Sequence, residues 1–325
     1  MANKKTKQNL IPLKEGQTIY TGTPISELVR SSYKNFVYNP KTDEAEIIDG
    51  GVTISLNDKD ALRYYDGDTV SLLLYTLTLN HETGNTTVYI NLKEYASKSG
   101  YDVYNEDEKT AKAQLDLFRK RFNKALRKLA NISVKWITTK GKARGDYERQ
   151  ILITGDGLKN GIQHIDINKK IIEPLRENDF ISQIPQTALL MIAGADDKTT
   201  TKNANKVLYK LSQHYNLNRN KERGSNNILS VQSVLSYTTL PTIEGLESKN
   251  NRNFERLIKE PLEAILDYLQ DTTHDIALWY YCKAKKEPYT DNELQSISTK
   301  ELLQTGYIYF ELATIDKPTL ADYSG

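Results

Sequence analysis

The residues with the clearest chemical potential are basic, and they are concentrated in one stretch of the chain. Between Arg119 and Arg149, eleven lysines and arginines are accompanied by only two acidic residues, a local net charge of +9 in a chain whose total is +2. Lysine and arginine neutralise phosphate groups, and such a one-sided distribution is typical of a nucleic-acid-binding face. A solvated basic surface without a ligand has a similar composition. The turn at residues 141–146, with Lys142 and Arg144, extends the same positive surface.

A second polar group precedes an apolar helical pattern nearer the C-terminus. Its members lie in SKNNRNFERLIKEP and are Lys249, Asn250, Asn251, Arg252, Asn253 and Arg256. Asparagine and arginine make bidentate contacts with adenine and guanine edges, and recognition helices read bases with their N-terminal residues. The asparagines are equally well interpreted as loop and helix N-cap residues. Arg252 and Arg256 are therefore the stronger candidates for base contacts.

Two long amphipathic helices are expected to present these groups. Over residues 106–132 an apolar residue recurs at every third or fourth position, which predicts one buried face, with Lys109 and the later basic residues on the opposite side. A similar pattern covers residues 251–269, where Pro261 should kink the helix or start a second segment. The predicted DNA-contacting residues on the two helices and the basic turn are Lys109, Lys120, Lys124, Arg127, Lys142, Arg144, Lys249, Asn251, Arg252 and Arg256.

The elements around these helices occur twice in the same order. Residues 66–154 and 200–312 each predict a helix, a short strand, a short helix, a long helix and a two-stranded hairpin. In the first copy the expected hairpin pairs SVKWITTK with YERQILIT across the basic turn, and in the second it pairs IALWYYCKAK with GYIYFEL. A helix on a small helical core can enter the major groove while a hairpin reaches the flanking backbone. Modules for protein association and dimerisation have a similar composition of elements.

The repeat predicts an α+β fold of two tandem winged-helix domains, each a helix-turn-helix with a β-hairpin wing. We place the N-terminal domain at residues 1–160, including a short β-rich extension, and the C-terminal domain at residues 161–325. Glycines at positions 155, 157 and 161 break the periodicity at this boundary. Short strands are expected between residues 35 and 56.

Motifs of catalysis are not found, so we expect a protein that is not an enzyme and needs no metal or other cofactor. The stretch Thr154–Lys159 has the wrong spacing for a phosphate-binding P-loop, and the four histidines lie far apart in the sequence. Asp66 and Asp68 could join His164 and Asp166 in a magnesium site. A helix cap before Thr69 explains the two aspartates more simply.

The remaining features predict a cytoplasmic protein with no membrane partner. The chain starts MANKKTKQNL, which has no apolar signal region, and its longest apolar run, residues 187–193, is too short to span a bilayer. Cys282 is the single cysteine, which excludes an internal disulfide and a cysteine-based zinc site.

The tandem pattern, with FRKRFNKALRKLANISVKWI in the first copy and FERLIKEPLEAILDYL before IALWYY in the second, resembles the plasmid replication initiators that bind repeated origin sites, called iterons. The resemblance covers about residues 60–312. It implies that the C-terminal module makes the main sequence-specific contacts, and that the N-terminal module binds the backbone and mediates dimerisation. No leucine-rich dimer motif is evident near the N-terminus.

The resulting hypothesis is a replication initiator of a plasmid or mobile element that binds duplex DNA and recruits a host helicase or initiator. A transcriptional regulator of a mobile element is the alternative in the same partner class. A metal-dependent primase or nickase is the alternative from a different class.

Overall fold

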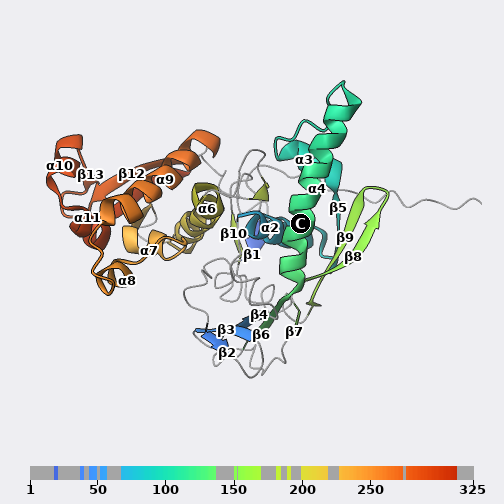
Figure 1. The fold of residues 1–325 in the computed structure, drawn as a ribbon, viewed down its shortest axis with the longest axis horizontal. Coiled ribbons are helices and arrows are strands. Elements are labelled where there is room, and N and C mark those ends of the chain that lie inside the picture. The colour runs from blue at the N-terminus through green and yellow to red at the C-terminus, as the bar shows by residue number, and fades with distance from the viewer. Residues whose placement is uncertain are drawn as a thin grey trace, which may run out of the picture.

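The computed structural model contains helices and several small antiparallel sheets, which confirms the expected α+β class (Figure 1). The residues that the structure describes are 18–20, 37–39, 44–49, 52–56, 67–136, 150–151, 153–169, 181–183, 189–191, 199–218, 227–273 and 276–312.

The first half of the chain is built around one long helix and a three-stranded sheet. Its elements, in chain order, are α2 (Gly67–Thr83), β5 (Thr87–Asn91), α3 (Leu92–Lys98), α4 (Glu108–Ala130), β8 (Ile153–Lys159) and β9 (Ile162–Ile167). The strand order is β5-β9-β8, so the last strand of the three lies in the middle. Asn160 and Gly161 join β8 to β9 with φ angles of 51° and 79°. Positive φ at both positions is what a type I′ hairpin turn requires, and Asn-Gly is the pair that adopts it most readily.

The strand that follows α4 belongs to a separate five-stranded sheet. Its strands are, in spatial order, β2 (Val37–Asn39), β3 (Glu44–Asp49), β4 (Val52–Leu56), β6 (Ile132–Trp136) and β7 (Gln150–Ile151). The short strands expected near the N-terminus are thus confirmed. β6 does pair with β7, as expected, but its other neighbour is β4. The prediction that this hairpin is the wing of the first copy is therefore wrong, because β6 belongs to a different sheet, and β8 and β9 form the hairpin beside β5.

The second half repeats the arrangement of the first. In chain order its elements are α6 (Thr199–Asn218), β11 (Ile228–Ser230), α7 (Val231–Leu235), α8 (Ile243–Glu247), the π-helical turn η4 (Glu255–Lys259), α9 (Glu260–Thr273), β12 (Ile276–Cys282), β13 (Glu287–Pro288), α10 (Asp291–Ser296), α11 (Thr299–Thr305) and β14 (Tyr307–Leu312). The sheet order is β11-β14-β12-β13, and the expected pairing of β12 with β14 is confirmed from Ile276↔Leu312 to Tyr281↔Tyr307.

An equivalent backbone hydrogen bond occurs in each half and shows how closely the arrangements of their elements correspond. The first residue of α3, Leu92, donates its backbone N–H to the carbonyl of Gly161 (3.1 Å), and the first residue of α7, Val231, donates to Gly306 (3.0 Å). Each glycine directly precedes an inner strand of its sheet, β9 or β14. The residue before each helix, Asn91 or Ser230, is an extended N-cap whose side chain accepts backbone N–H groups. A repeat of these elements is therefore present in the described residues, but its first copy extends to Ile167 and closes with β8 and β9 instead of the expected hairpin.

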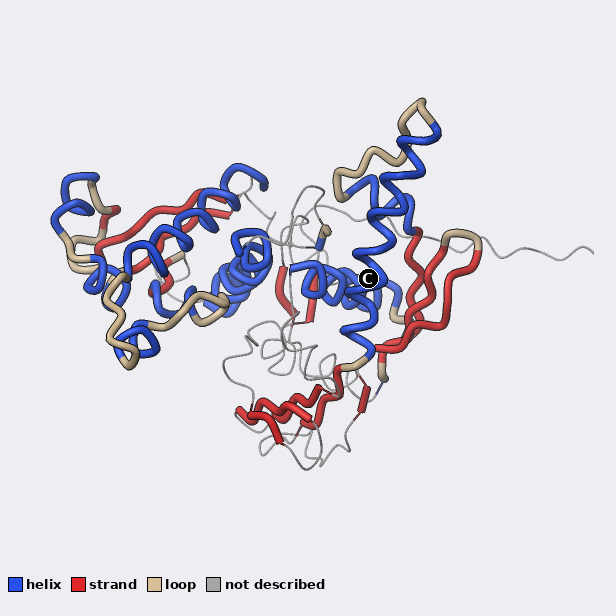
Figure 2. The backbone as a smooth tube through the Cα atoms, in the orientation of Figure 1, coloured by secondary structure: helices blue, strands red, loops and turns tan. Residues whose placement is uncertain are grey.

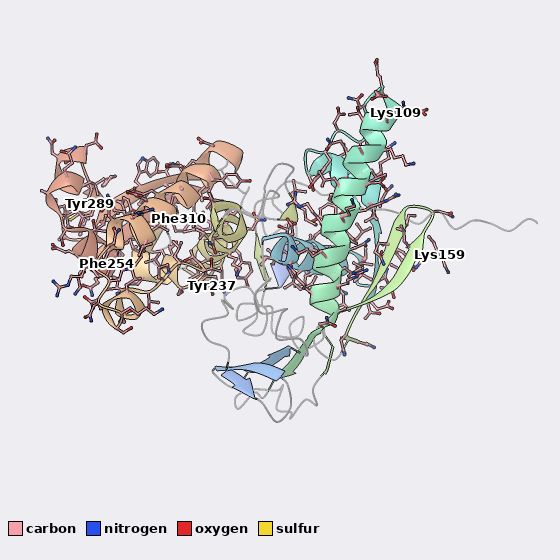
Figure 3. The ribbon with its side chains drawn as sticks, in the orientation of Figure 1. Lys109, Lys159, Tyr237, Phe254, Tyr289 and Phe310 are labelled. Atoms are coloured by element: carbon pink, nitrogen blue, oxygen red, sulfur yellow. The ribbon has the colours of Figure 1, made fainter. Side chains whose placement is uncertain are left out.

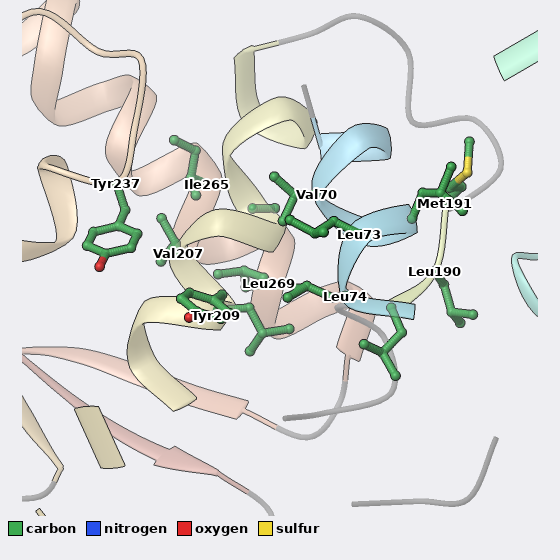
Figure 4. Close-up of a cluster of buried hydrophobic side chains, with 14 of the residues drawn as sticks. Val70, Leu73, Leu74, Leu190, Met191, Val207, Tyr209, Tyr237, Ile265 and Leu269 are labelled. Atoms are coloured by element: carbon green, nitrogen blue, oxygen red, sulfur yellow. The ribbon is translucent and has the colours of Figure 1, made fainter. Parts of the chain in front are cut away.

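The hydrophobic core runs without interruption from one half to the other. Side chains of α2, α6 and α9 belong to one buried cluster, in which Leu73, Val207 and Leu269 are each 1% exposed or less (Figure 4). Within it Asn205 of α6 donates a hydrogen bond to Ser71 of α2 (2.5 Å). Burying many aliphatic side chains against one another is the main stabilising term for such an arrangement. Figure 2 shows α2 and α6 between the two sheets of the halves.

The boundary between the halves lies further along the chain than expected. A cut between residues 160 and 161 would separate β8 from β9, which pair over Ile153↔Ile167 to Lys159↔Ile162. Since β9 also pairs with β5, residues up to 167 belong with the first half. The division into two domains stays a prediction. In addition, β1 (Thr18–Tyr20) pairs with β10 (Ile181–Gln183), and β1 packs near α2.

Candidate nucleic-acid interface

The first long helix, α4, is fixed at both ends and along one face. At its start Asp107 accepts hydrogen bonds from the backbone N–H groups of Lys109 (3.3 Å) and Thr110 (3.2 Å). The hydroxyl of Thr110 also donates to this carboxylate, which lowers the pKa of Asp107. Phe118 and Phe122 are fully buried and pack against Tyr95 of α3. The expected amphipathic helix is confirmed, and its apolar stripe fixes which side chains face outward.

The outward face of α4 is basic over most of its length. Its exposed cations are Lys109, Lys112, Lys120, Lys124 and Arg127. The acids within the helix are Glu108 in the first turn and Asp116, whose half-exposed side chain lies 3.5 Å from Arg119. Four of these cations were predicted from the sequence, and the structure places all four on this one face. Figure 3 labels Lys109 at the end of α4. For Lys120 and Arg127 no ion-pair partner is found among the described residues. Contact with DNA stays a prediction.

Other cations of the same segment have structural roles instead. Arg121 donates two hydrogen bonds to Asp68 of α2, from Nε to Oδ2 (2.8 Å) and from Nη2 to Oδ1 (2.6 Å), and a third to the hydroxyl of Tyr101. Burial alone would lower the pKa of the guanidinium, but the hydrogen bonds and charge of Asp68 outweigh it and raise the pKa. Lys128 is only 7% exposed. The +9 segment therefore offers less free positive charge than its composition suggests.

The same ion pair explains why an aspartate stands at the start of α2. Asp68 lies in the first turn, where a negative charge also favours the helix. Asp66 lies outside the described residues. Among the residues that the structure describes, no group of three or more histidine, cysteine, aspartate or glutamate side chains is placed to share a metal ion. His164 instead packs edge-on against Tyr89, and Asp166 accepts a hydrogen bond from Thr87.

The predicted wing residues cannot be placed. Lys142 and Arg144 lie outside the described residues. At the β8–β9 turn, which takes the corresponding position beside β5, the structure offers Lys159 instead (Figure 3). The sequence reasoning missed this residue. The signal that could have found it was the Asn-Gly pair directly after it, which is typical of a hairpin turn.

The loop before the second long helix is held in one conformation by its own polar groups. Asn250 has a φ of 53°, a left-handed conformation that asparagine tolerates better than most residues. The side-chain oxygen of Asn251 accepts from the backbone N–H of Asn253 (3.0 Å), and that of Asn253 accepts from Arg256 (3.4 Å). Lys249 and Asn251 both donate their backbone N–H groups to Leu246. These bonds favour the loop and cap interpretation of the asparagines. They use the side-chain oxygens of Asn251 and Asn253 and not their side-chain N–H groups.

The cations of this loop and helix are exposed. Lys249, Arg252 and Arg256 are all exposed, and none of the three has an ion-pair partner among the described residues. Buried Phe254 anchors the start of the helix between them. The loop thus holds Lys249 and Arg252 beside Arg256 of the first helical turn, on a backbone fixed by hydrogen bonds, which is the arrangement that a preorganised recognition segment needs.

The expected break at Pro261 is confirmed and has a specific form. Proline has no N–H to donate to the residue one turn earlier, and a π-helical turn, η4, precedes it before α9 begins at Glu260. Within this turn Lys259 bonds Glu255 (2.7 Å) and lies 3.7 Å from Glu263. The hydrogen bond from Lys259 and that from Thr299 of α11 lower the pKa of Glu255. Lys259 is therefore engaged within the protein.

Further cations come together at the β12–β13 turn, which sequence reasoning did not single out. Lys283, Lys285 and Lys286 are exposed there, and Lys286 has a φ of 61°. Lys285 is paired with Glu293, and the ammonium of Lys283 lies 5.0 Å from the ring centre of Tyr307. The run CKAKKE is continuous with the expected strand IALWYYCKAK in the sequence, and the structure ends that strand at Cys282 and places Lys283–Lys286 in the turn.

Comparisons with known proteins do not assign the chain to a family. No family model matches it, and no curated protein matches it. A solved structure described as the selenomethionine derivative of domains 2 and 3 of RctB is similar over 90% of this chain and 100% of that one, with 9% sequence identity and a TM-score of 0.41. These values are too low to carry a conclusion about fold or function. No helix in the described part of the chain is both long enough and apolar enough to cross a membrane.

Proposed function

We propose that this chain is a replication initiator of a plasmid or mobile element, which acts without enzymatic activity by binding repeated duplex DNA sites at an origin. The observation that carries the proposal is the repeated order of elements, in which each half sets one long helix beside a small antiparallel sheet, of three strands in the first half and four in the second, and carries exposed cations on that helix. The order of elements and the inner position of the last strand support the proposal that each half is a winged-helix module. The proposal names two such modules.

The charge distribution supports duplex DNA as the partner. The outward face of α4 carries five exposed cations, and the loop and first turn of the second long helix carry three more. If about six phosphates are neutralised, the logarithm of affinity should fall with the logarithm of salt concentration at a slope of about −5. A slope near zero between about 50 and 200 mM salt would remove DNA as the main ligand.

The experiment that tests the proposed function is selection of bound duplexes from random DNA, followed by footprinting on the selected sequence. An initiator should protect arrays of the repeated sequence, whereas a transcriptional regulator should protect one isolated operator. Metal-dependent nicking or nucleotide incorporation on the same DNA would instead favour the enzyme alternative. Failure to enrich any sequence would contradict sequence-specific binding.

Substitutions should then separate residues that hold the backbone from residues that read bases. Arg127→Ala on α4 should weaken specific and random duplexes alike, because phosphate contacts carry no sequence information. Arg256→Ala should cost about 1 to 3 kcal/mol on the selected site and much less on random DNA. Equal losses for both variants on both duplexes would contradict this division. A homodimer and a host helicase or initiator are further partners within this proposal.

A further inference from the structure

The exposed row of residues along the second long helix changes sign from one end to the other. The row consists of Arg256, Glu260, Ala264, Asp267 and Asp271, all exposed and spaced by three or four residues, so they follow one another along the same face. Before the row stand the exposed Lys249 and Arg252 of the loop. The face is thus basic at its beginning and acidic over the remaining turns.

The first long helix has no such reversal. Its exposed cations extend from Lys109 in the first turn to Arg127 near the end, and the single acid after Glu108 within the helix, Asp116, lies 3.5 Å from Arg119. At a rise of about 1.5 Å per residue, these cations span roughly 27 Å of helix. Since Asp116 is offset by Arg119, the face stays positive along most of α4, as a helix that follows a DNA backbone along its length requires.

The acidic residues of the row lie at increasing distances from Arg256, so their effect on DNA binding depends on how the helix is oriented. Along the helix axis Glu260 lies about 6 Å from Arg256, Asp267 about 16 Å and Asp271 about 22 Å. At physiological salt, charges are screened over about 8 Å. If the helix lay lengthwise in a groove, all three carboxylates would come close to phosphates and repel them. If only its first turn approached the DNA, Asp267 and Asp271 would lie beyond the screening distance.

The structure of the loop that precedes the helix is compatible with an approach of only the first helical turn to the DNA. Its backbone is tied by the Asn251 and Asn253 side chains and by the hydrogen bonds to Leu246, while Phe254 anchors it to the core. The loop and the first helical turn can therefore place Arg252 and Arg256 in a groove while the later turns of the helix stay outside it. Lys259, the next cation, is held by Glu255 and Glu263 and adds no free charge beyond the first turn.

We infer that the second long helix meets duplex DNA end-on, through residues 249–256, with its acidic later turns directed away from the DNA. This inference rests on the proposed function and specifies how the base-reading segment is oriented. It confines base readout in the second half to a short stretch of DNA read by Arg252 and Arg256. It also assigns Glu260, Asp267 and Asp271 a role in excluding a lengthwise register, because sliding the helix along the groove brings their charges toward phosphates.

The test is a series of identical charge reversals along the same row, made one at a time in the full chain: Glu260→Lys, Asp267→Lys and Asp271→Lys. Affinity for the selected duplex is measured at about 0.1 M salt, where added positive charge near phosphates strengthens binding. Glu260→Lys should raise affinity about three- to tenfold. Asp271→Lys should change it less than about twofold, with Asp267→Lys between them, because the distance from the DNA grows along the helix. Thermal unfolding of each variant verifies that the fold is unchanged.

A gradient that falls from position 260 to position 271 supports end-on docking. Equal gains at all three positions would overturn it in favour of lengthwise docking, and no gain at position 260 would place the whole helix away from the DNA. If the wild-type chain itself shows no duplex affinity, the proposed function fails together with this inference. If the wild type binds and the gradient is flat, only the inference fails.

Discussion

Replacing Arg121 by alanine should damage the fold and leave DNA binding largely intact, even though Arg121 belongs to the most basic stretch of the sequence. Its guanidinium makes two hydrogen bonds to Asp68 and one to Tyr101, and the ion pair joins α4 to α2. The neighbouring Lys120 is exposed and has no ion-pair partner among the described residues. The two adjacent cations therefore form a matched pair for separating structure from binding.

The size of the effect follows from the burial of the pair. Removing one partner of a fully buried ion pair costs about 3 to 5 kcal/mol. Here the side chains of Arg121 and Asp68 remain 20% and 23% exposed, so water recovers part of this loss. We expect Arg121→Ala to lower the free energy of unfolding by about 2 to 3 kcal/mol. Lys120→Ala should change it by less than about 0.5 kcal/mol, as is usual for exposed positions.

Urea unfolding followed by circular dichroism measures both values, and duplex titration of the same proteins measures binding. Lys120→Ala should weaken binding, whereas Arg121→Ala, still folded without urea, should bind within about twofold of the wild type because its charge is not available to phosphates. A double-mutant cycle with Asp68→Asn should give a coupling free energy of about 1 to 2 kcal/mol. A stable Arg121→Ala variant with lost DNA affinity would refute the assignment of Arg121 to the fold.

Two further predictions concern the second half. Gly306→Ala should destabilise the protein by about 1 to 3 kcal/mol in the same urea assay, since an added Cβ would lie 2.3 Å from the carbonyl oxygen of Leu302; an unchanged midpoint would contradict the close approach. The pKa of Glu255 is lowered from 4.5 by hydrogen bonds from Lys259 and Thr299, so its stabilising effect is present above pH 4.5 and is lost as pH falls through the lowered folded-state pKa. Glu255→Gln should therefore have a lower unfolding midpoint than the wild type at about pH 7 and the same midpoint at about pH 3. A difference that does not change with pH would argue against the hydrogen bonds from Lys259 and Thr299 to the ionised carboxylate.

The elements with strong helical periodicity were predictable from the sequence. The helix expected at residues 106–132 is Glu108–Ala130, and that expected at 251–269 is a π-turn and α-helix covering Glu255–Thr273. Both carry apolar stripes that determine which face packs inward, and the exposure of the cations opposite those stripes follows directly. The repeat of elements was predictable for the same reason. The short strands near the N-terminus also carried a clear alternating pattern.

In the first half the pairing of β6 with β7 was predictable, but the other neighbour of β6 was not. The residues of β6 read as a strand, but alternation specifies a face and not a neighbour, and its neighbour β4 lies far upstream in the sequence. The glycines at positions 155, 157 and 161 favour a domain boundary in the sequence, and they obscure the two short strands that the Asn160-Gly161 turn joins. The role of Arg121 was hidden for a similar reason, since its partner Asp68 is brought close only by the packing of α2 on α4.

The continuous contact between α2, α6 and α9 bears on the spacing of any DNA site that the chain recognises. Because these helices share one buried cluster, the two halves are held by packing rather than by a loose tether. Under the proposed function, the angular phase between their contacts around the duplex is then set by the protein. Inserting about five base pairs between the two contacted segments, roughly half of the 10 to 10.5 base pairs in a helical turn, would rotate one segment to the far side of the duplex. A flexibly joined protein would tolerate this insertion, whereas this chain should lose one of its two contacts, because packing fixes both the phase and the distance between the halves.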